Sequence, residues 1–202
     1  PELSNSATWE GELTSEELSA LKSYTGAGYE DLNVQLYGTK WKDIPQSKKD
    51  MAAAIYNGLN KFELKHGITV TRQSDFQIFG KSWHESMTVQ EVKDHLSKSK
   101  GLIQNDGFLS TSANSKGAAI AGSGLVVTYH IPPSIGAGAY VNPISYHKGG
   151  TENEFLINNN AVFKFDIGSV KEVNGKIHVT AEWIGQAQNQ KNIKKSKGKK
   201  KK

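Results

Sequence analysis

Two glutamates, Glu152 and Glu154, stand one residue apart at the start of an apolar run. If this run is a β-strand, residues i and i+2 point to the same face. Both carboxylates would then project into one cleft, while Phe155 and Ile157 face the core. Two like charges this close repel each other unless a polar or cationic group answers them. The pair is therefore a candidate catalytic site, although the same pattern also fits a solvated strand edge that discourages pairing with other chains.

Polar and cationic residues that could offset these two negative charges lie elsewhere in the chain. Arg72 follows the β-branched segment 68–71, which predicts a strand that carries Arg72 at its end. Ser110-Thr111-Ser112 continues an apolar start at 108–109, so its hydroxyls are expected in a core strand, where each needs a partner. Neighbouring backbone could supply those partners, which would make the hydroxyls structural. Together the three features describe a site with a cation, hydroxyl donors and two carboxylates.

Helical patterns dominate the first hundred residues. Thr14 to Glu17 and Thr88 to Glu91 are capping boxes, which mark helix starts. Apolar residues at three- and four-residue steps predict the longest helix over residues 46–65. We expect Gly26 and Gly28 to break the chain between the first two helices. The predicted helices cover residues 14–24, 29–36, 46–65 and a short segment from residue 88.

Strand patterns replace helical ones after Gly101. Asn174-Gly175 between two β-rich segments is the strongest short-range hairpin signal, and it joins residues 169–173 to 176–180. Trp183 is expected in the core. Helices first and strands afterwards predict an α+β fold. The other predicted strands cover residues 108–112, 125–131, 137–141, 153–157 and 162–167.

Length and composition indicate one globular domain of 202 residues. The absence of cysteine excludes disulfides, thiolate metal sites and a cysteine nucleophile. No apolar run approaches the roughly 18 residues of a membrane-spanning helix, and the first residues lack the pattern of a signal peptide. We expect a processed form or a fragment. The histidines show no metal-ligand spacing, so no metal is expected; they are His66, His84, His95, His130, His147 and His178.

The basic charge belongs to the end of the chain. Eight lysines and no acidic residue lie in residues 191–202, so the formal charge of +5 becomes −3 for residues 1–190. A segment this charged and this poor in apolar residues is not expected to fold. It predicts contact with nucleic acid or an anionic surface, or a solubilising end. We therefore expect an N-terminal extension (1–12), a catalytic domain (13–185) and a disordered tail (186–202).

The order of Arg72, Ser110-Thr111-Ser112 and Glu152-Asn153-Glu154 resembles that of the mono-ADP-ribosyltransferase exotoxins. The likeness is greatest to the enzymatic components of clostridial actin-modifying binary toxins and to their phage-encoded relatives. It covers residues of roughly 13 to 184. It implies N-terminal helices packed on a two-sheet mixed β core, with NAD as the substrate. Further segments that match the family's patterns are 24–33, 107–112, 125–140 and 146–154.

The resemblance assigns a role to each residue. Breaking the nicotinamide–ribose bond develops an oxocarbenium ion, which the carboxylate of Glu154 would stabilise. Arg72 would grip the diphosphate of NAD. Ser110 would hold Glu154 in its rotamer, and Thr111 and Ser112 would support the strand. Gln77 would add a polar contact, and the rings of Tyr24 and Tyr29 would line the adenine and phosphate side.

The acceptor is set, by the same resemblance, by Glu152, because family members with glutamate at this position modify arginine. A carboxylate can orient a guanidinium and take its proton as the nitrogen attacks. Tyr146 would contact the target protein. We predict a monomeric protein-arginine mono-ADP-ribosyltransferase with a side activity as an NAD glycohydrolase, secreted or phage-delivered, acting on a host protein that bears an acceptor arginine.

Two departures and two alternatives accompany this prediction. The loop 114–124 lacks the aromatic residue and the arginine that often close over NAD, and Gln73 stands where a second arginine is common. The first change predicts that NAD is held more weakly or by a different group. We expect catalysis to survive both changes, which would alter the affinity for NAD. The alternatives are a phage structural protein of the minor-head type that carries the domain, and an inactive NAD-fold binding module.

Overall fold

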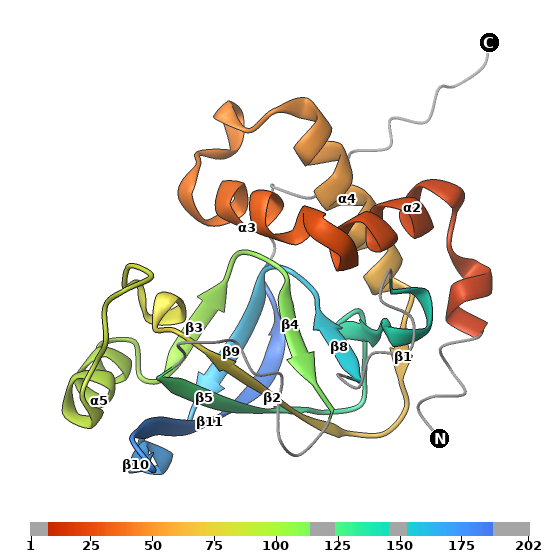
Figure 1. The fold of residues 1–202 in the computed structure, drawn as a ribbon. Coiled ribbons are helices and arrows are strands. Elements are labelled where there is room, and N and C mark those ends of the chain that lie inside the picture. Colours follow the sequence, from red (N-terminus) through yellow and green to blue (C-terminus); the bar gives the residue numbers. More distant parts are fainter. Residues whose placement is uncertain (1–7, 114–123, 146–152, 188–202) are drawn as a thin grey trace.

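The computed structural model describes residues 8–113, 124–145 and 153–187. The helices α2, α3 and α4 lie together on one side of the main β-sheet, and α5 lies at the edge of that sheet (Figure 1). Residues 8–12 add a helical segment whose Trp9 is buried in the core and donates from Nε1 to Gly58 O over 2.7 Å. The helices are α2 (Ser15–Ser23), α3 (Tyr29–Gly38), α4 (Gln46–Asn60) and α5 (Val89–Lys98).

Both predicted capping boxes are confirmed. Thr14 Oγ1 accepts from Glu17 N, and Glu17 Oε2 accepts from Thr14 N, each over 3.2 Å. Thr88 and Glu91 make the same pair of bonds at the start of α5. These starts were predictable because each depends on four consecutive residues.

The predicted break between the first two helices is confirmed, and it lies in the turn η1 (Tyr24–Gly28). The chain kinks at Gly26, where φ is −83° and ψ is −106°, and then continues as α3. A Cβ on Gly28 would lie 2.9 Å from Ser23 O, so a larger residue would clash with the backbone of the preceding turn. Gly26 therefore separates α2 from α3, and Gly28 lets the chain turn tightly between them.

The predicted helix over 46–65 is too long, because α4 ends at Asn60. Residues beyond it are drawn into long-range pairing: β1 (Glu63–Leu64) pairs with β6 (Ser134–Ile135), and Gly136 N donates to Phe62 O over 3.1 Å. Gly136 has a φ of +87°, and a Cβ there would lie 2.4 Å from Asn60 Oδ1. Contacts about seventy residues away thus set the end of the helix.

Nine strands form the main sheet. Their hydrogen-bonded order is β3-β9-β11-β5-β2-β4-β8-β7, with β10 also paired to β11. The pair β11–β5 is parallel and the other pairs of this sheet are antiparallel. The strands not yet given bounds are β2 (Ile68–Ser74), β3 (Leu102–Asn105), β4 (Leu109–Ser112), β5 (Leu125–Ile131), β7 (Gly138–Tyr140), β8 (Glu154–Ile157), β9 (Ala161–Phe165), β10 (Lys171–Val173) and β11 (Lys176–Gln186).

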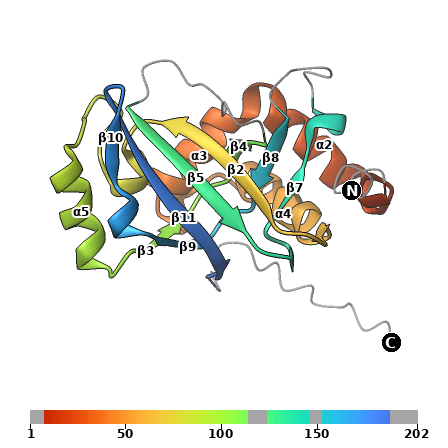
Figure 2. The ribbon, with the colours of Figure 1, turned by 90° about the horizontal axis from the view of Figure 1, so that it is seen from below.

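The sheet has two halves that meet at one point. The strands β2 and β4 share the single Cα pair Thr71 and Ser112, whereas β2 pairs with β5 over seven residues. In Figure 1, β4 and β8 lie beneath α2 and α3, and Figure 2 shows β2, β5 and β11 in front with α2, α3 and α4 behind. The predicted α+β class and mixed sheet are confirmed.

The predicted strands are found, and the hairpin is confirmed. Asn174 and Gly175 have φ values of 51° and 79° and join β10 to β11. Trp183, expected in the core, is half-buried and packs against the edge of the core beside an irregularity in the pairing of β11. Three short strands were not predicted: β1, β3 and β6.

Candidate functional site

The strands β4 and β8 set the position of Glu154. Ser112 lies opposite Glu154 and Ser110 lies opposite Leu156 in the antiparallel register. Residues opposite each other share a face, so both serines and Glu154 lie on one side of these two strands. The partner directly across from Glu154 is thus Ser112, and Ser110 is its diagonal neighbour. Glu154 is half-buried, whereas Ser112 is buried.

Arg72 reaches β4 from β2. It lies inside β2 and not at its end, because the strand continues to Ser74 along β5, which corrects the prediction. Its Nη1 donates to Ser110 O over 2.9 Å. A guanidinium has five N–H donors, so this bond fixes the group and leaves further donors for a ligand. The structure therefore places Arg72 and Ser110 together at the junction of the two halves.

Thr111 points to the opposite face and is structural. Its hydroxyl donates to Phe155 O over 2.6 Å, and the side chain is buried. This is the alternative in which neighbouring backbone satisfies the hydroxyl, and it holds for Thr111. The bond ties the middle of β4 to β8 beyond the regular ladder.

Tyr24 is buried beneath the site. Burial raises the pKa of its phenol, and the amide of Asn33 opposes that shift by donating to Tyr24 Oη over 2.9 Å. Arg72 also lowers this pKa and Glu154 raises it, so both charges lie close enough to act on Tyr24. A buried ring offers little surface for stacking. Tyr29, whose ring centroid lies 6.3 Å from that of Tyr24, is 43% exposed.

Asn33 is the residue whose role the sequence reasoning missed. Its Oδ1 accepts from Phe108 N over 3.1 Å and its Nδ2 donates to Phe108 O over 3.3 Å, so one side chain binds both backbone groups of the residue before β4. A Cβ on Gly107 would lie 2.7 Å from Asn33 Oδ1 and from the ring of Tyr37. The signal was an amide beside the buried Leu32 and Leu36 of α3.

Other predicted residues lie apart from this cluster or outside the described ranges. Gln77 is exposed in the turn η3 (Gln77–Phe79), five residues after Arg72. Gln73 accepts a bond from Lys176 Nζ over 2.9 Å. Glu152 and Tyr146 lie outside the described residues.

The strand argument for a shared cleft does not extend to Glu152. The strand β8 begins at Glu154, and Asn153 has a φ of 43°, in the left-handed region. The alternation of faces applies only within a strand. Phe155 and Ile157 are buried as expected, and Leu156 between them is also fully buried, so β8 is covered on both faces.

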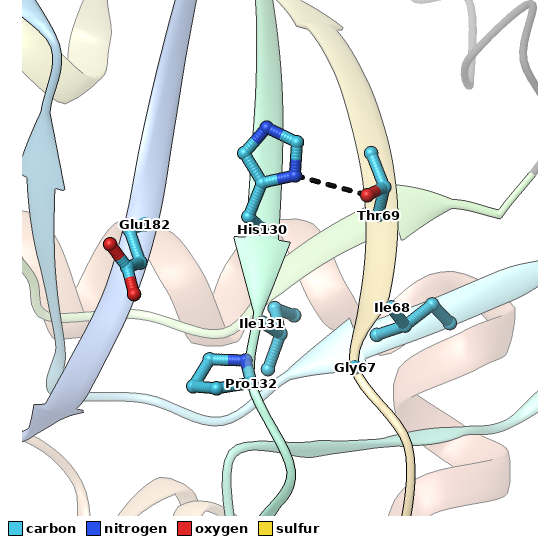
Figure 3. Close-up of a pocket in the computed structure, with 7 residues that line it drawn as sticks. All are labelled: Gly67, Ile68, Thr69, His130, Ile131, Pro132 and Glu182. Atoms are coloured by element: carbon cyan, nitrogen blue, oxygen red, sulfur yellow. Dashed lines mark hydrogen bonds between the residues drawn. The ribbon is translucent and has the colours of Figure 1, made fainter.

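A separate hollow lies near the end of β5 (Figure 3). Thr69 Oγ1 and His130 Nδ1 are 3.0 Å apart there. None of the predicted site residues lines it. Its lining residues are Gly67, Ile68, Thr69, His130, Ile131, Pro132 and Glu182.

Within 8–113, 124–145 and 153–187, no group of three or more histidine, aspartate or glutamate side chains is placed to hold a metal ion. In the same ranges, no helix has the length and apolar character needed to cross a membrane.

A sequence model of the ADP-ribosyltransferase exoenzyme family matches residues 3–198. The chain belongs to this family. The arginine transferase EFV of Enterococcus faecalis, an NAD(+)--arginine ADP-ribosyltransferase, is 29% identical over 167 residues, which are 81% of this chain and 31% of that protein. The chain thus spans about a third of the length of this curated relative.

Solved structures confirm the fold. Plx2a, an ADP-ribosyltransferase toxin from Paenibacillus larvae, superimposes with a TM-score of 0.74 at 25% identity, covering 91% of this chain and 93% of that one. BECa, an ADP-ribosylating toxin of a binary enterotoxin of C. perfringens determined with NADH, gives 0.73 at 25% identity, covering 91% and 46%. The predicted ADP-ribosyltransferase fold and family are therefore confirmed.

Proposed function

We propose that this chain is an NAD-dependent protein-arginine mono-ADP-ribosyltransferase that also hydrolyses NAD slowly. The main support is the arrangement on β4 in a chain of this family. Ser112 of β4 lies across from Glu154, and Ser110 O of the same strand accepts a hydrogen bond from Arg72. A carboxylate and a fixed guanidinium at one junction match the two charged parts of the reaction, the ribose cation and the diphosphate.

Glu154 acts on the ribose. The bond between the ribose and nicotinamide breaks, and its electron pair leaves with nicotinamide, so positive charge develops on the ribose. A carboxylate held at that point stabilises the transition state more than the ground state. Ser112 and Ser110 support Glu154 from β4, and Thr111 fixes β4 to β8.

Arg72 binds the diphosphate. Its bond to Ser110 O holds the guanidinium in place, so binding NAD costs less side-chain entropy than ordering a free arginine would. Tyr29, which has an exposed ring, and Gln77 line the outer part of the NAD site. Tyr24 supports them from below. The diphosphate thus meets a preorganised cation.

Glu152 selects the acceptor. Its carboxylate orients the guanidinium of the target arginine and takes the proton released when the nitrogen forms its bond to the ribose carbon. The name of the enterococcal relative supports arginine as the acceptor class. Tyr146 contacts the target protein.

The target is a protein of a host cell. The chain acts as a monomer and is a secreted or phage-delivered effector. The toxin names of Plx2a and BECa support this setting. The lysine-rich segment after residue 187 contacts nucleic acid or an anionic surface.

The matched pair Glu154→Gln and Glu172→Gln tests this function. The same chemical change is made at the site and at an exposed position of β10. We expect Glu154→Gln to lose nicotinamide release by at least about a hundredfold, with and without an arginine-like acceptor. Glu172→Gln should behave as the wild type, and equal activity of the two variants would contradict the role of Glu154.

Glu152→Gln separates the two carboxylates. We expect it to lose transfer to arginine while it still releases nicotinamide by hydrolysis. Arg72 is the only arginine in the sequence. Self-modification on arginine could therefore occur only at Arg72, so ADP-ribose on any other arginine belongs to the added protein.

A further inference from the structure

The residue between the two glutamates has an unusual backbone. Asn153 has a φ of 43°. The other non-glycine residues with positive φ in the described ranges are Lys100, Asn160 and Asn174. Lys100 and Asn174 precede glycines of positive φ in turns, and Asn160 lies in the turn before β9. Of these four residues, only Asn153 adjoins a proposed catalytic carboxylate.

Hydrogen bonds hold Asn153 from two strands. Its carbonyl oxygen accepts from Ala113 N over 3.0 Å, just after β4. Its Oδ1 accepts from the hydroxyl of Tyr140 over 2.8 Å, at the end of β7. One residue further on, Glu154 O accepts from Val141 N over 3.1 Å. The start of β8 is thus fixed on both sides.

We propose that Tyr140 and Asn153 are positioning residues that fix the backbone of residue 153, which joins the two glutamates in the sequence, and that they thereby favour transfer to the acceptor over hydrolysis. This inference rests on the proposed function. Transfer needs both carboxylates in place, whereas hydrolysis needs Glu154 alone. A looser residue 153 would therefore impair transfer more than hydrolysis.

The choice of residue argues for positioning and not for turn formation alone. Glycine adopts positive φ without cost, while asparagine tolerates it and adds an amide. The oxygen of that amide accepts from the half-buried phenol of Tyr140, which is protonated at neutral pH, as any tyrosine is unless its pKa is strongly lowered. A catalytic group displaced by about 1 Å loses on the order of a hundredfold in rate. A hydrogen bond that holds the backbone next to Glu154 can thus affect chemistry without touching the substrate.

Three variants test this inference. Asn153→Gly keeps the left-handed backbone and removes the amide. Tyr140→Phe keeps the ring and removes the hydroxyl. Asn174→Gly makes the same change as the first at a left-handed position in the β10–β11 hairpin, and is the matched control. For each variant, nicotinamide release is measured with and without agmatine, together with the thermal unfolding midpoint.

We expect Asn153→Gly and Tyr140→Phe to lower formation of ADP-ribosyl-agmatine about tenfold, while release without agmatine changes less than about threefold. The double variant should lose no more than either single one, because both remove the same bond. Asn174→Gly should change neither activity. A structural role alone would lower the midpoint but leave the ratio of transfer to hydrolysis unchanged.

Equal losses of transfer and hydrolysis, or no loss in Tyr140→Phe, would overturn this inference and leave the proposed function standing. A folded wild-type chain that releases no nicotinamide would overturn both. If Asn153→Gly fails to fold, Tyr140→Phe decides alone, since it leaves the backbone and the ring unchanged.

Discussion

The strands β8 and β11 show two ways of building a strand. On β11, buried Ile177, Val179 and Ala181 alternate with more exposed residues, because one face packs on the core and the other is open. On β8, three consecutive residues after Glu154 are fully buried. The alternation on β11 follows from its own sequence, whereas the continuous burial of β8 requires other segments to cover both of its faces. The proposed site begins where the doubly covered strand starts, and contacts from distant segments hold it there.

Among the contrasts that follow, the largest effect should come from losing the hydrogen bond between Arg72 on β2 and Ser110 on β4, which joins the two halves of the sheet beside the Thr71–Ser112 pair. Arg72→Lys removes the planar guanidinium that bonds to Ser110 O. We expect kcat/KM for NAD to fall about a hundredfold, mostly through KM, since lysine offers the diphosphate one point charge. Steady-state kinetics of nicotinamide release measure this. An unchanged KM would show that Arg72 does not bind NAD.

The next effect concerns close packing behind the site. Gly107→Ala would place a methyl group 2.7 Å from Asn33 Oδ1 and from the ring of Tyr37. We expect a loss of about 1–3 kcal/mol in the free energy of unfolding. Gly38→Ala is the control, because a Cβ there meets nothing within 4 Å. Denaturant unfolding measures the free energy of unfolding of both variants. Equal losses in the two would contradict this account.

A smaller contrast compares two polar contacts. Asn33→Ala leaves both backbone groups of Phe108 without their side-chain partner, at a cost of about 1–3 kcal/mol. Thr69→Ala removes the exposed contact with His130 in the separate hollow and should cost less than about 0.5 kcal/mol. Only the first variant should also slow nicotinamide release. If Thr69→Ala slowed nicotinamide release as much as Asn33→Ala, the hollow that contains Thr69 and His130 would take part in function.

The smallest effect should appear as a pH dependence. Burial, with Lys171 and Lys176 nearby, lowers the pKa of His178 on β11. The folded chain then binds this proton less readily than the unfolded chain, so stability falls as pH drops through the ordinary value of about 6.5. His178→Gln should lose less stability than the wild type between pH 7.5 and 5.5. Thermal unfolding at both pH values checks this, and equal losses would contradict it.

The comparison also explains what could be predicted from the sequence. The capping boxes, the Asn174-Gly175 hairpin and the bounds of β5 follow from neighbouring residues. The end of α4 did not, because the pairing of β1 with β6 decides it. The position of Arg72 inside β2 depends on β5, which lies more than fifty residues later.

The residues of the proposed site were named from the sequence, but their arrangement could not be. The order of the motifs, through its resemblance to the exotoxin family, suggested Arg72, Ser110 and Glu154. The bond from Arg72 to Ser110 O, the bridge from Asn33 to Phe108 and the contact between Tyr140 and Asn153 each join separate segments. No periodicity in a single sequence encodes such contacts. Such long-range contacts distinguish the surroundings of β8 from those of β11, whose burial pattern follows from its own sequence.

The most direct test of the central claim is nicotinamide release from NAD by the purified chain, with and without agmatine as a free guanidinium acceptor. The account predicts release that agmatine accelerates, with ADP-ribosyl-agmatine as the product. No release in either condition, from protein shown to be folded by circular dichroism and a cooperative thermal transition, would contradict it.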